Sequence, residues 1–145
     1  KVNSIIENTL SLIQYDRRIQ DITVVRDIAP AMPELVTDGA QLSQALVNLV
    51  LNAADAMPSG GTLTIRTRAD GNRAVIELQD TGAGISKDQL DRIFNPFYTT
   101  KPQGTGMGLT VSKDIIEKLG GTLSVSSETG KGTIFSILLP LRRQS

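Results

Sequence analysis

Neither cysteine nor histidine occurs among the 145 residues of this sequence. The lack of cysteine excludes disulfides, thiolate nucleophiles and cysteine metal sites, and it is compatible with a cytoplasmic protein. The lack of histidine excludes Ser-His-Asp triads, imidazole metal ligands and imidazole acid–base chemistry within the chain. Any chemistry must therefore use carboxylates, amides, hydroxyls, lysines or backbone groups.

An excess of one charge and long apolar runs are missing too. Lys plus Arg number 15 and Asp plus Glu number 15, a balance that does not favour binding to nucleic acid or to a membrane surface. No apolar run approaches the roughly 20 residues of a membrane span. Hydrophobic residues make up 39% and charged residues 21%, which is enough for a core. We expect one soluble, monomeric domain over residues 1–145, without a nucleic-acid or membrane partner.

The periodicity of apolar residues predicts three helices and five strands. The helices are expected at 4–15, 39–57 and 109–119, and the strands at 22–28, 62–68, 73–80, 122–127 and 133–140. Ser4 and Glu7 form a predicted capping box, and Asp38 is the expected N-cap of the second helix. The glycine pair Gly120-Gly121 is expected to end the third helix. One face of the first helix is expected to consist of Ile5, Ile6, Thr9, Leu12 and Ile13. A further short strand is considered at 35–37. This order predicts an α/β two-layer sandwich, with about three helices on one face of a mixed sheet.

A polar stripe lies on the second predicted helix, "QLSQALVNLVLNAADAM" (41–57). At about 100° per residue, Asn48, Asn52 and Asp55 fall within a window of roughly 60°. In one interpretation the two amides satisfy neighbouring backbone groups. In the other, the stripe faces a ligand or a hard cation through its carbonyl oxygens. The expected core stripe of the same helix is Leu42, Ala45, Leu46, Leu49, Ala53 and Ala56.

Two glycine-rich stretches follow, "DTGAGI" (80–85) after a strand and "GTGMGL" (104–109) before a helix. The first can be an ordinary turn and the second a flexible loop. Alternatively, glycines at a helix N-terminus present backbone N–H groups to phosphate oxygens. Neither stretch is a familiar phosphate motif. No Walker string occurs, and the last glycine of a Rossmann fingerprint is replaced by Leu109 or Lys87.

Four motifs occur in order: "NLVLNAADA", "DTGAGI", "IFNPFYTTK" and "GTGMGL". Together they resemble the N, G1, F and G2 boxes of the catalytic ATP-binding domain of bacterial sensor histidine kinases. The wider group is the gyrase–Hsp90–histidine kinase–MutL superfamily, with its Bergerat ATP-binding fold. "FYTTK" is most similar to the nitrogen-regulator type of sensor kinase. The resemblance covers about residues 20–140.

The resemblance implies ATP and Mg²⁺ as ligands and assigns roles to single residues. Asn52 would bind Mg²⁺, Asp80 would accept a hydrogen bond from the adenine amino group, and Thr133 would support that pocket. Residues 86–103 would form the ATP lid, with Lys101 near the terminal phosphates and acting with Asn48 and Asn52 in catalysis. The other nucleotide-binding residues implied are Ala53, Asp55, Ala56, Gly82, Gly84, Ile85, Tyr98, Thr99, Thr100, Gly104, Thr105, Gly106, Met107, Gly108 and Leu109.

Two positions depart from the pattern. Members of the superfamily that hydrolyse ATP carry a glutamate four residues before the Mg²⁺ ligand, where this chain has Asn48. An amide is a poor base, so Asn48 favours phosphoryl transfer to a better nucleophile. Asp55 stands where many sensor kinases have a basic residue, which favours a water-mediated or structural role over a phosphate contact.

A histidine kinase phosphorylates a histidine, and this chain contains none. The resemblance therefore implies a separate histidine-bearing dimerisation domain as partner and, indirectly, a response regulator. We expect the chain to be an excised or separately expressed catalytic domain, with the histidine helix upstream. Two alternatives stay open: a serine kinase or ATPase of the same superfamily, and a nucleotide-binding module that acts without catalysis through lid closure on a partner.

Overall fold

A computed structural model describes residues 2–13, 20–28, 38–57, 60–82, 108–128 and 132–140. The helices in these segments are α1 (Val2–Ile13), α2 (Gly39–Asp55) and α4 (Gly108–Lys118). The strands are β1 (Ile22–Ile28), β2 (Gly61–Asp70), β3 (Arg73–Asp80), β4 (Thr122–Glu128) and β5 (Gly132–Pro140). All three helices and all five strands in the described segments overlap the predicted ones, with ends that differ by at most two residues.

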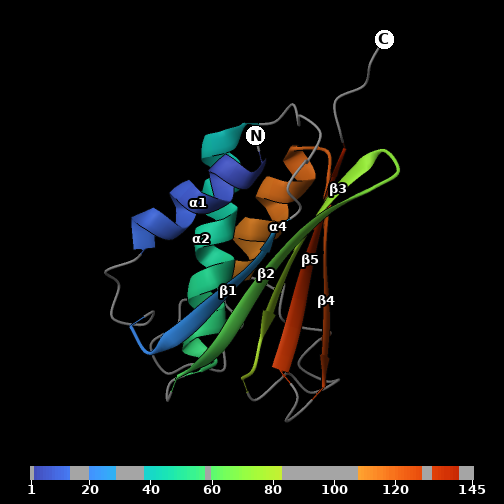
Figure 1. Cartoon of the computed structure of the whole chain (residues 1–145). Helices are drawn as coiled ribbons and strands as arrows, with labels where there is room; N and C mark the ends of the chain where they lie inside the picture. Colours follow the sequence, from blue (N-terminus) through green and yellow to red (C-terminus); the bar gives the residue numbers. More distant parts are fainter. Residues whose placement is uncertain are drawn as a thin grey trace.

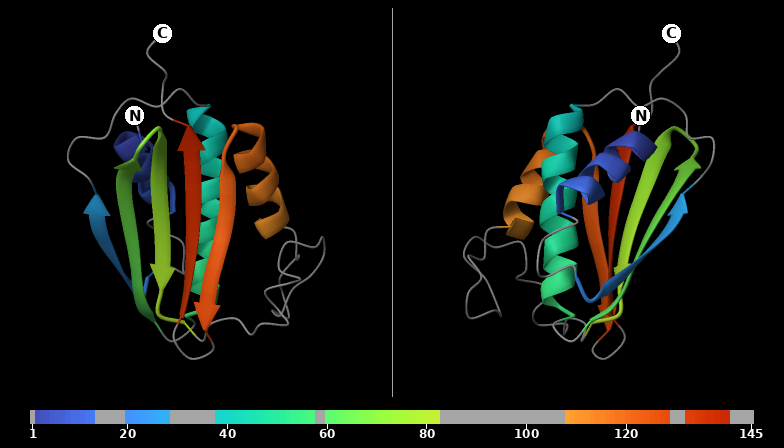
Figure 2. Two further views of the ribbon diagram at one scale, coloured as in Figure 1. Left: turned by 90° about the vertical axis from the view of Figure 1, so that its right-hand side faces the viewer. Right: turned by 60° about the vertical axis from the view of Figure 1, so that its left-hand side comes forward.

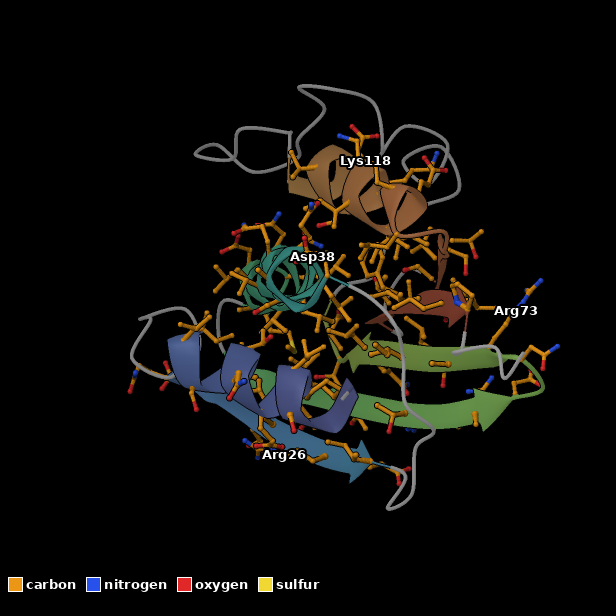
Figure 3. The ribbon with its side chains drawn as sticks, turned by 90° about the horizontal axis from the view of Figure 1, so that it is seen from above. Arg26, Asp38, Arg73 and Lys118 are labelled. Carbon is orange, nitrogen blue, oxygen red and sulfur yellow. The ribbon has the colours of Figure 1, made fainter. Side chains whose placement is uncertain are left out.

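The strands form one mixed sheet in the order β1-β2-β3-β5-β4. β1 runs parallel to β2, and the other neighbouring strands pair antiparallel. The helices lie over one face of this sheet, with side chains filling the space between the layers (Figures 1 and 3). The predicted two-layer α/β sandwich is therefore confirmed.

These helices leave the other face of the sheet uncovered (Figure 2). Its side chains pair with one another across the strands, as expected for a solvated surface. The Arg66 guanidinium donates to Gln79 Oε1 at 2.6 Å, and Arg68 lies 3.0 Å from Glu77 Oε1. The main apolar cluster lies on the helix side, and Val75, which alternates with the core residues Ala74 and Ile76, is a buried apolar side chain of the other face.

Short-range signals at the helix ends are confirmed. The Asp38 carboxylate accepts hydrogen bonds from the backbone N–H groups of Ala40 at 3.1 Å and Gln41 at 3.2 Å, which makes it the N-cap of α2. After α4, the N–H of Gly121 donates to the Ile116 carbonyl at 2.9 Å, so the glycine pair ends the helix.

The predicted start and face of α1 are partly wrong. The helix begins at Val2, so Ser4 lies inside it and cannot be the N-cap of a capping box. The face toward the core contains Ile6, Leu10 and Ile13, which follow the i, i+4, i+7 spacing of one stripe. Leu12 is 73% exposed because it projects to the other side of the helix. Residues 14–15 and 35–37 lie outside the described segments.

α2 is the central helix of the layer, in contact with α1, α4, β2 and β3. Ser43 shares a 2.9 Å hydrogen bond with Thr9 of α1, and Ser112 of α4 donates to the Ala45 carbonyl at 3.4 Å. Because α2 has neighbours on several sides, its buried residues cover more of the helix surface than one stripe. The buried residues of α2 are Leu42, Ala45, Leu46, Leu49, Val50, Ala53 and Ala54.

The core prediction for α2 missed Val50 and Ala54 and wrongly included Ala56. Val50 is 1% exposed because it lies with Ile6 of α1 and Ile65 of β2 around one small cavity in the core. Ala56 is the C-cap, with φ −77° and ψ −9°, and it is half-buried. In the described segments no helix is both long and apolar enough to cross a membrane.

Leu49→Ala should lower the free energy of unfolding by about 2–5 kcal/mol, because Leu49 is 0% exposed and its removal leaves a cavity. Leu12→Ala makes the same chemical change at an exposed site and should stay within about 0.5 kcal/mol of wild type. Urea denaturation of both variants checks the pair. Equal destabilisation would contradict the position of α2 at the centre of the core.

Candidate functional site

Several elements end together at one edge of the molecule. The C-terminal end of α2 lies near the end of β3, the start of β5 and the end of β4 (Figure 1). Leu63, Asp80, Thr133 and Ser127 form one continuous row of paired residues across β2, β3, β5 and β4. Directly paired residues point to the same face of a sheet, and Leu63 belongs to the core. The whole row therefore faces the helix layer.

Asp80 is the buried charge of this row, only 2% exposed. Its Oδ1 accepts a hydrogen bond from the Gly82 N–H at 2.9 Å, and the Thr133 backbone N–H is a second donor to the carboxylate. Burial raises the pKa of Asp80 above its ordinary value of 3.8, although both hydrogen bonds act in the opposite direction. The two donors do not fully replace lost hydration, so a ligand with a further donor would stabilise the carboxylate.

Gly82 brings the segment after β3 against the end of α2. A Cβ atom at this position would lie 2.5 Å from the carbonyl oxygen of Ala56, a distance that no side chain tolerates. The resemblance predicts a glycine here for the approach of a nucleotide base. The structure adds a second reason, because the helix backbone itself occupies the space of a side chain.

Thr81 ties the same segment to β2 and was not predicted as a site residue. Its hydroxyl accepts the Thr62 N–H at 3.1 Å and donates to the Met57 sulfur at 3.4 Å. Because Met57 follows α2, these bonds hold three chain segments at fixed distances. Only its position between Asp80 and Gly82 in "DTG" could have pointed to it.

Thr133 and Ser127 continue the row toward the sheet edge. The Ser127 hydroxyl donates to the Gly132 carbonyl at 2.9 Å, and its oxygen lies 2.9 Å from the Thr133 hydroxyl oxygen. Gly132 has φ +89°, and a Cβ there would overlap the Asp80 carbonyl oxygen. Sequence reasoning predicted Thr133 but missed Ser127 and Gly132, whose contacts depend on strand register.

The polar stripe of α2 is half-buried at Asn48, Asn52 and Asp55. Asn48 Oδ1 accepts from Gln44 Nε2 at 3.2 Å, so a neighbouring side chain, not the backbone, is its partner. Asn52 and Asp55 have interactions of their own. Ala53 is buried beside them, and Ala56 ends the helix at the Gly82 contact.

The donor set suits Mg²⁺ better than a softer metal. No group of three or more acidic, histidine or cysteine side chains that could enclose a metal ion occurs in the described segments. Mg²⁺ commonly takes only one or two protein oxygens and completes its shell with waters and substrate phosphates. The amide oxygen of Asn52 and the carboxylate of Asp55 on the same helix fit that mode.

Of the remaining predicted site residues, Gly108 and Leu109 lie in the described segments. Gly108 and Leu109 begin α4, as the "GTGMGL" pattern predicts for a helix start. The lid at 86–103 lies outside the described segments. So do Gly84, Ile85, Tyr98, Thr99, Thr100, Lys101, Gly104, Thr105, Gly106 and Met107.

Comparison with known proteins agrees with this architecture. Residues 37–143 match the family described as "Histidine kinase-, DNA gyrase B-, and HSP90-like ATPase". Sensor histidine kinase ZraS of Escherichia coli (strain K12) is 39% identical over 140 residues, which cover 97% of this chain and 30% of that protein. The chain spans between 14% and 34% of the length of the curated relatives considered.

Two solved structures have the same fold and are 28% and 25% identical in sequence to this chain. The catalytic domain of histidine kinase ThkA in a nucleotide-free form has a TM-score of 0.85 and 28% identity, covering 96% of this chain and 91% of that one. Full-length ShkA in complex with AMPPNP has a TM-score of 0.86 and 25% identity, covering 100% of this chain and 31% of that one.

Comparison of the wild type with Asp80→Asn should show that the contribution of Asp80 to the free energy of unfolding decreases as pH rises. The folded-state pKa of Asp80 is raised above 3.8, so between 3.8 and that higher pKa the folded chain binds more protons than the unfolded chain. The contribution of Asp80 to the wild-type free energy of unfolding is complete below the pKa of the unfolded state and is lost as pH rises through the pKa of the folded state. The amide of the variant cannot titrate and makes no such contribution.

Urea denaturation of both proteins between about pH 3.5 and 7 measures this effect. The wild-type free energy of unfolding minus that of the variant should decrease as pH rises. A carboxyl ¹³C titration reports the pKa of Asp80 directly, and a midpoint below 3.8 would contradict the burial argument.

Proposed function

Because the chain belongs to the family of histidine kinase-, DNA gyrase B- and HSP90-like ATPases, we propose that it binds Mg·ATP and donates the γ-phosphoryl group to a histidine. The accepting histidine lies on a separate dimerisation domain, since none occurs in these 145 residues. The phosphoryl group then passes to a response regulator, as in two-component signal transduction. The similarity to sensor histidine kinases supports this choice within the family.

The buried carboxylate of Asp80 is the observation that carries the proposal. It is 2% exposed, it retains capacity to accept hydrogen bonds, and it lies at the edge where α2 and β3 end and β5 begins (Figure 1). The exocyclic amino group of adenine supplies a donor of the kind this carboxylate needs. A buried acceptor that recognises a donor discriminates strongly against ligands without one.

In this proposal, the α2 side of the site binds Mg²⁺ and the phosphates. Asn52 would hold Mg²⁺ through its amide oxygen, and Asp55, one turn later, would act through a water molecule. The metal would neutralise charge on the phosphate oxygens and orient the terminal phosphate. Lys101 and the glycines at 104, 106 and 108 complete the proposed phosphate contacts, with the lid at 86–103 closing over them.

Asn48 decides between transfer and hydrolysis in this proposal. During transfer the bond from the γ-phosphorus to the bridging oxygen breaks, a bond to an imidazole nitrogen of the partner forms, and ADP leaves. A neutral imidazole is itself a good nucleophile, whereas water needs a base. The Asn48 side chain is an amide that accepts a hydrogen bond from Gln44, and it cannot take a proton from water at neutral pH.

The test combines the chain with Mg·ATP and a helical domain that carries a phosphoacceptor histidine. Acid-labile phosphate should appear on the added domain. Asn52→Ala should abolish both this labelling and Mg·ATP binding in calorimetry, because the cation loses its protein ligand. The helix should persist, since alanine is the better helix former.

Gln41→Ala is the matched control, an amide removed from the other end of the same helix. It should leave binding and labelling unchanged. Unchanged nucleotide affinity in Asn52→Ala would overturn the metal assignment. Binding without any labelling would instead favour a nucleotide-binding module without catalysis.

Asn48→Glu should turn the domain toward hydrolysis. Glutamate at this position stands one helical turn before Asn52, within reach of a water near the γ-phosphate. A positioned base contributes about 10²–10⁴-fold, so steady-state phosphate release should rise and transfer to the histidine domain should fall. A wild-type chain that already hydrolyses ATP as fast as a dedicated ATPase would contradict the kinase proposal and favour the ATPase alternative.

A further inference from the structure

Three hydrogen-bonding groups meet where β4 and β5 pair. The Ser127 hydroxyl oxygen lies 2.9 Å from the Gly132 carbonyl oxygen and 2.9 Å from the Thr133 hydroxyl oxygen. A carbonyl oxygen can only accept, so Ser127 must donate its single hydroxyl hydrogen to Gly132. The bond between the two hydroxyls can then form only if Thr133 donates to Ser127.

This assignment fixes the polarity of the Thr133 hydroxyl. Its one hydrogen points to Ser127, so toward any further group it can act only as an acceptor. Thr133 pairs directly with Asp80 across β3 and β5, and both side chains face the helix layer. The row therefore presents two neighbouring acceptors: the Asp80 carboxylate and the Thr133 hydroxyl, whose only hydrogen is donated to Ser127.

The backbone around Gly132 makes the arrangement stiff. Gly132 has φ +89°, and the position of its missing side chain is filled by the carbonyl oxygen of Asp80. Gly132 also pairs with Glu128 across β4 and β5, and this pairing holds its carbonyl beside Ser127. A hydroxyl with a fixed acceptor is preorganised, which lowers the cost of binding a complementary ligand.

We propose that Ser127 is a positioning residue for nucleotide specificity: it holds the Thr133 hydroxyl as an acceptor beside Asp80, so that the row selects 6-amino over 6-oxo purine nucleotides. This inference rests on the proposed function, because it concerns the base-recognition side of the same site. A 6-amino group, or a water that it orients, supplies hydrogens to both acceptors. A 6-oxo group presents another acceptor, and the row has no hydrogen for it.

Ser127→Ala removes the acceptor that holds the Thr133 hydrogen. The Thr133 hydroxyl can then rotate and donate to a 6-oxo oxygen. Calorimetry with ATP and with inosine triphosphate, both in Mg²⁺, measures the ratio of the two affinities. The ratio should fall by roughly 3- to 10-fold, the equivalent of one neutral hydrogen bond.

Two further variants separate positioning from folding. Ser127→Thr keeps the hydroxyl and should restore the wild-type ratio. Ser124→Ala removes a serine from the same strand, on the exposed face, and should leave the ratio unchanged. In a Thr133→Val background, Ser127→Ala should have no further effect on the ratio, because the group that it orients is gone.

The outcomes distinguish this inference from the proposed function. If wild type prefers ATP and Ser127→Ala weakens both nucleotides equally, Ser127 has only a structural role and the inference is wrong, while the proposed function stands. If Ser127→Ala changes the ratio as strongly with valine at position 133, the effect does not pass through Thr133 and the inference is also wrong. A wild-type chain that binds neither nucleotide removes the proposed function and this inference together.

Discussion

The contact between Gly82 and the Ala56 carbonyl is the constraint on which the rest of the site depends. It sets the distance between the end of β3 and the end of α2 without an intervening side chain. The row of Asp80, Thr133 and Ser127, which we propose to recognise the base, therefore lies close to the helix that carries Asn52. Any larger residue at position 82 would push the two apart and separate the groups proposed for adenine from those proposed for Mg²⁺.

A second constraint is electrostatic. Asp80 is buried at a cost that its two backbone donors do not fully offset, which is why its pKa is raised. A sequence selected for stability alone would place a neutral or apolar residue here. A carboxylate at this position is useful where a ligand supplies the missing donor. Asp80 would then lower the free energy of unfolding of the empty domain and raise that of the ligand-bound domain.

The sheet supplies the rigidity that both constraints need. Register places Asp80, Thr133 and Ser127 side by side on three strands, and Thr81 bonds to both β2 and Met57. Asp80 on β3 and Thr133 on β5 are about 50 residues apart in sequence, whereas Ser127 and Thr133 are only six residues apart in one hairpin. The proposed recognition of the base thus depends on strand pairing, whereas the proposed metal site depends on one helix.

Much of the fold was accessible from local patterns. Apolar periods of 3.6 and 2 predicted all the described helices and strands, and Asp38 and the Gly120-Gly121 pair marked two helix ends. Local patterns failed where partners decide burial. Leu12 looked like a core residue and is exposed. Val50 was omitted although it is buried, in a place where Ile6 and Leu10 of α1 and Ile65 of β2 line the same small cavity.

The sequence by itself determined the element order, the polar stripe on α2, the absence of an internal histidine acceptor and the identity of Asp80 as a candidate. These depend on residue type and on spacing along one element. Only the tertiary structure decided that Gly82 meets Ala56, that burial raises the pKa of Asp80, and that Ser127 bonds to Gly132 and Thr133. The physical reason is that desolvation and side-chain pairing depend on which segments meet in space, and no local pattern encodes that meeting.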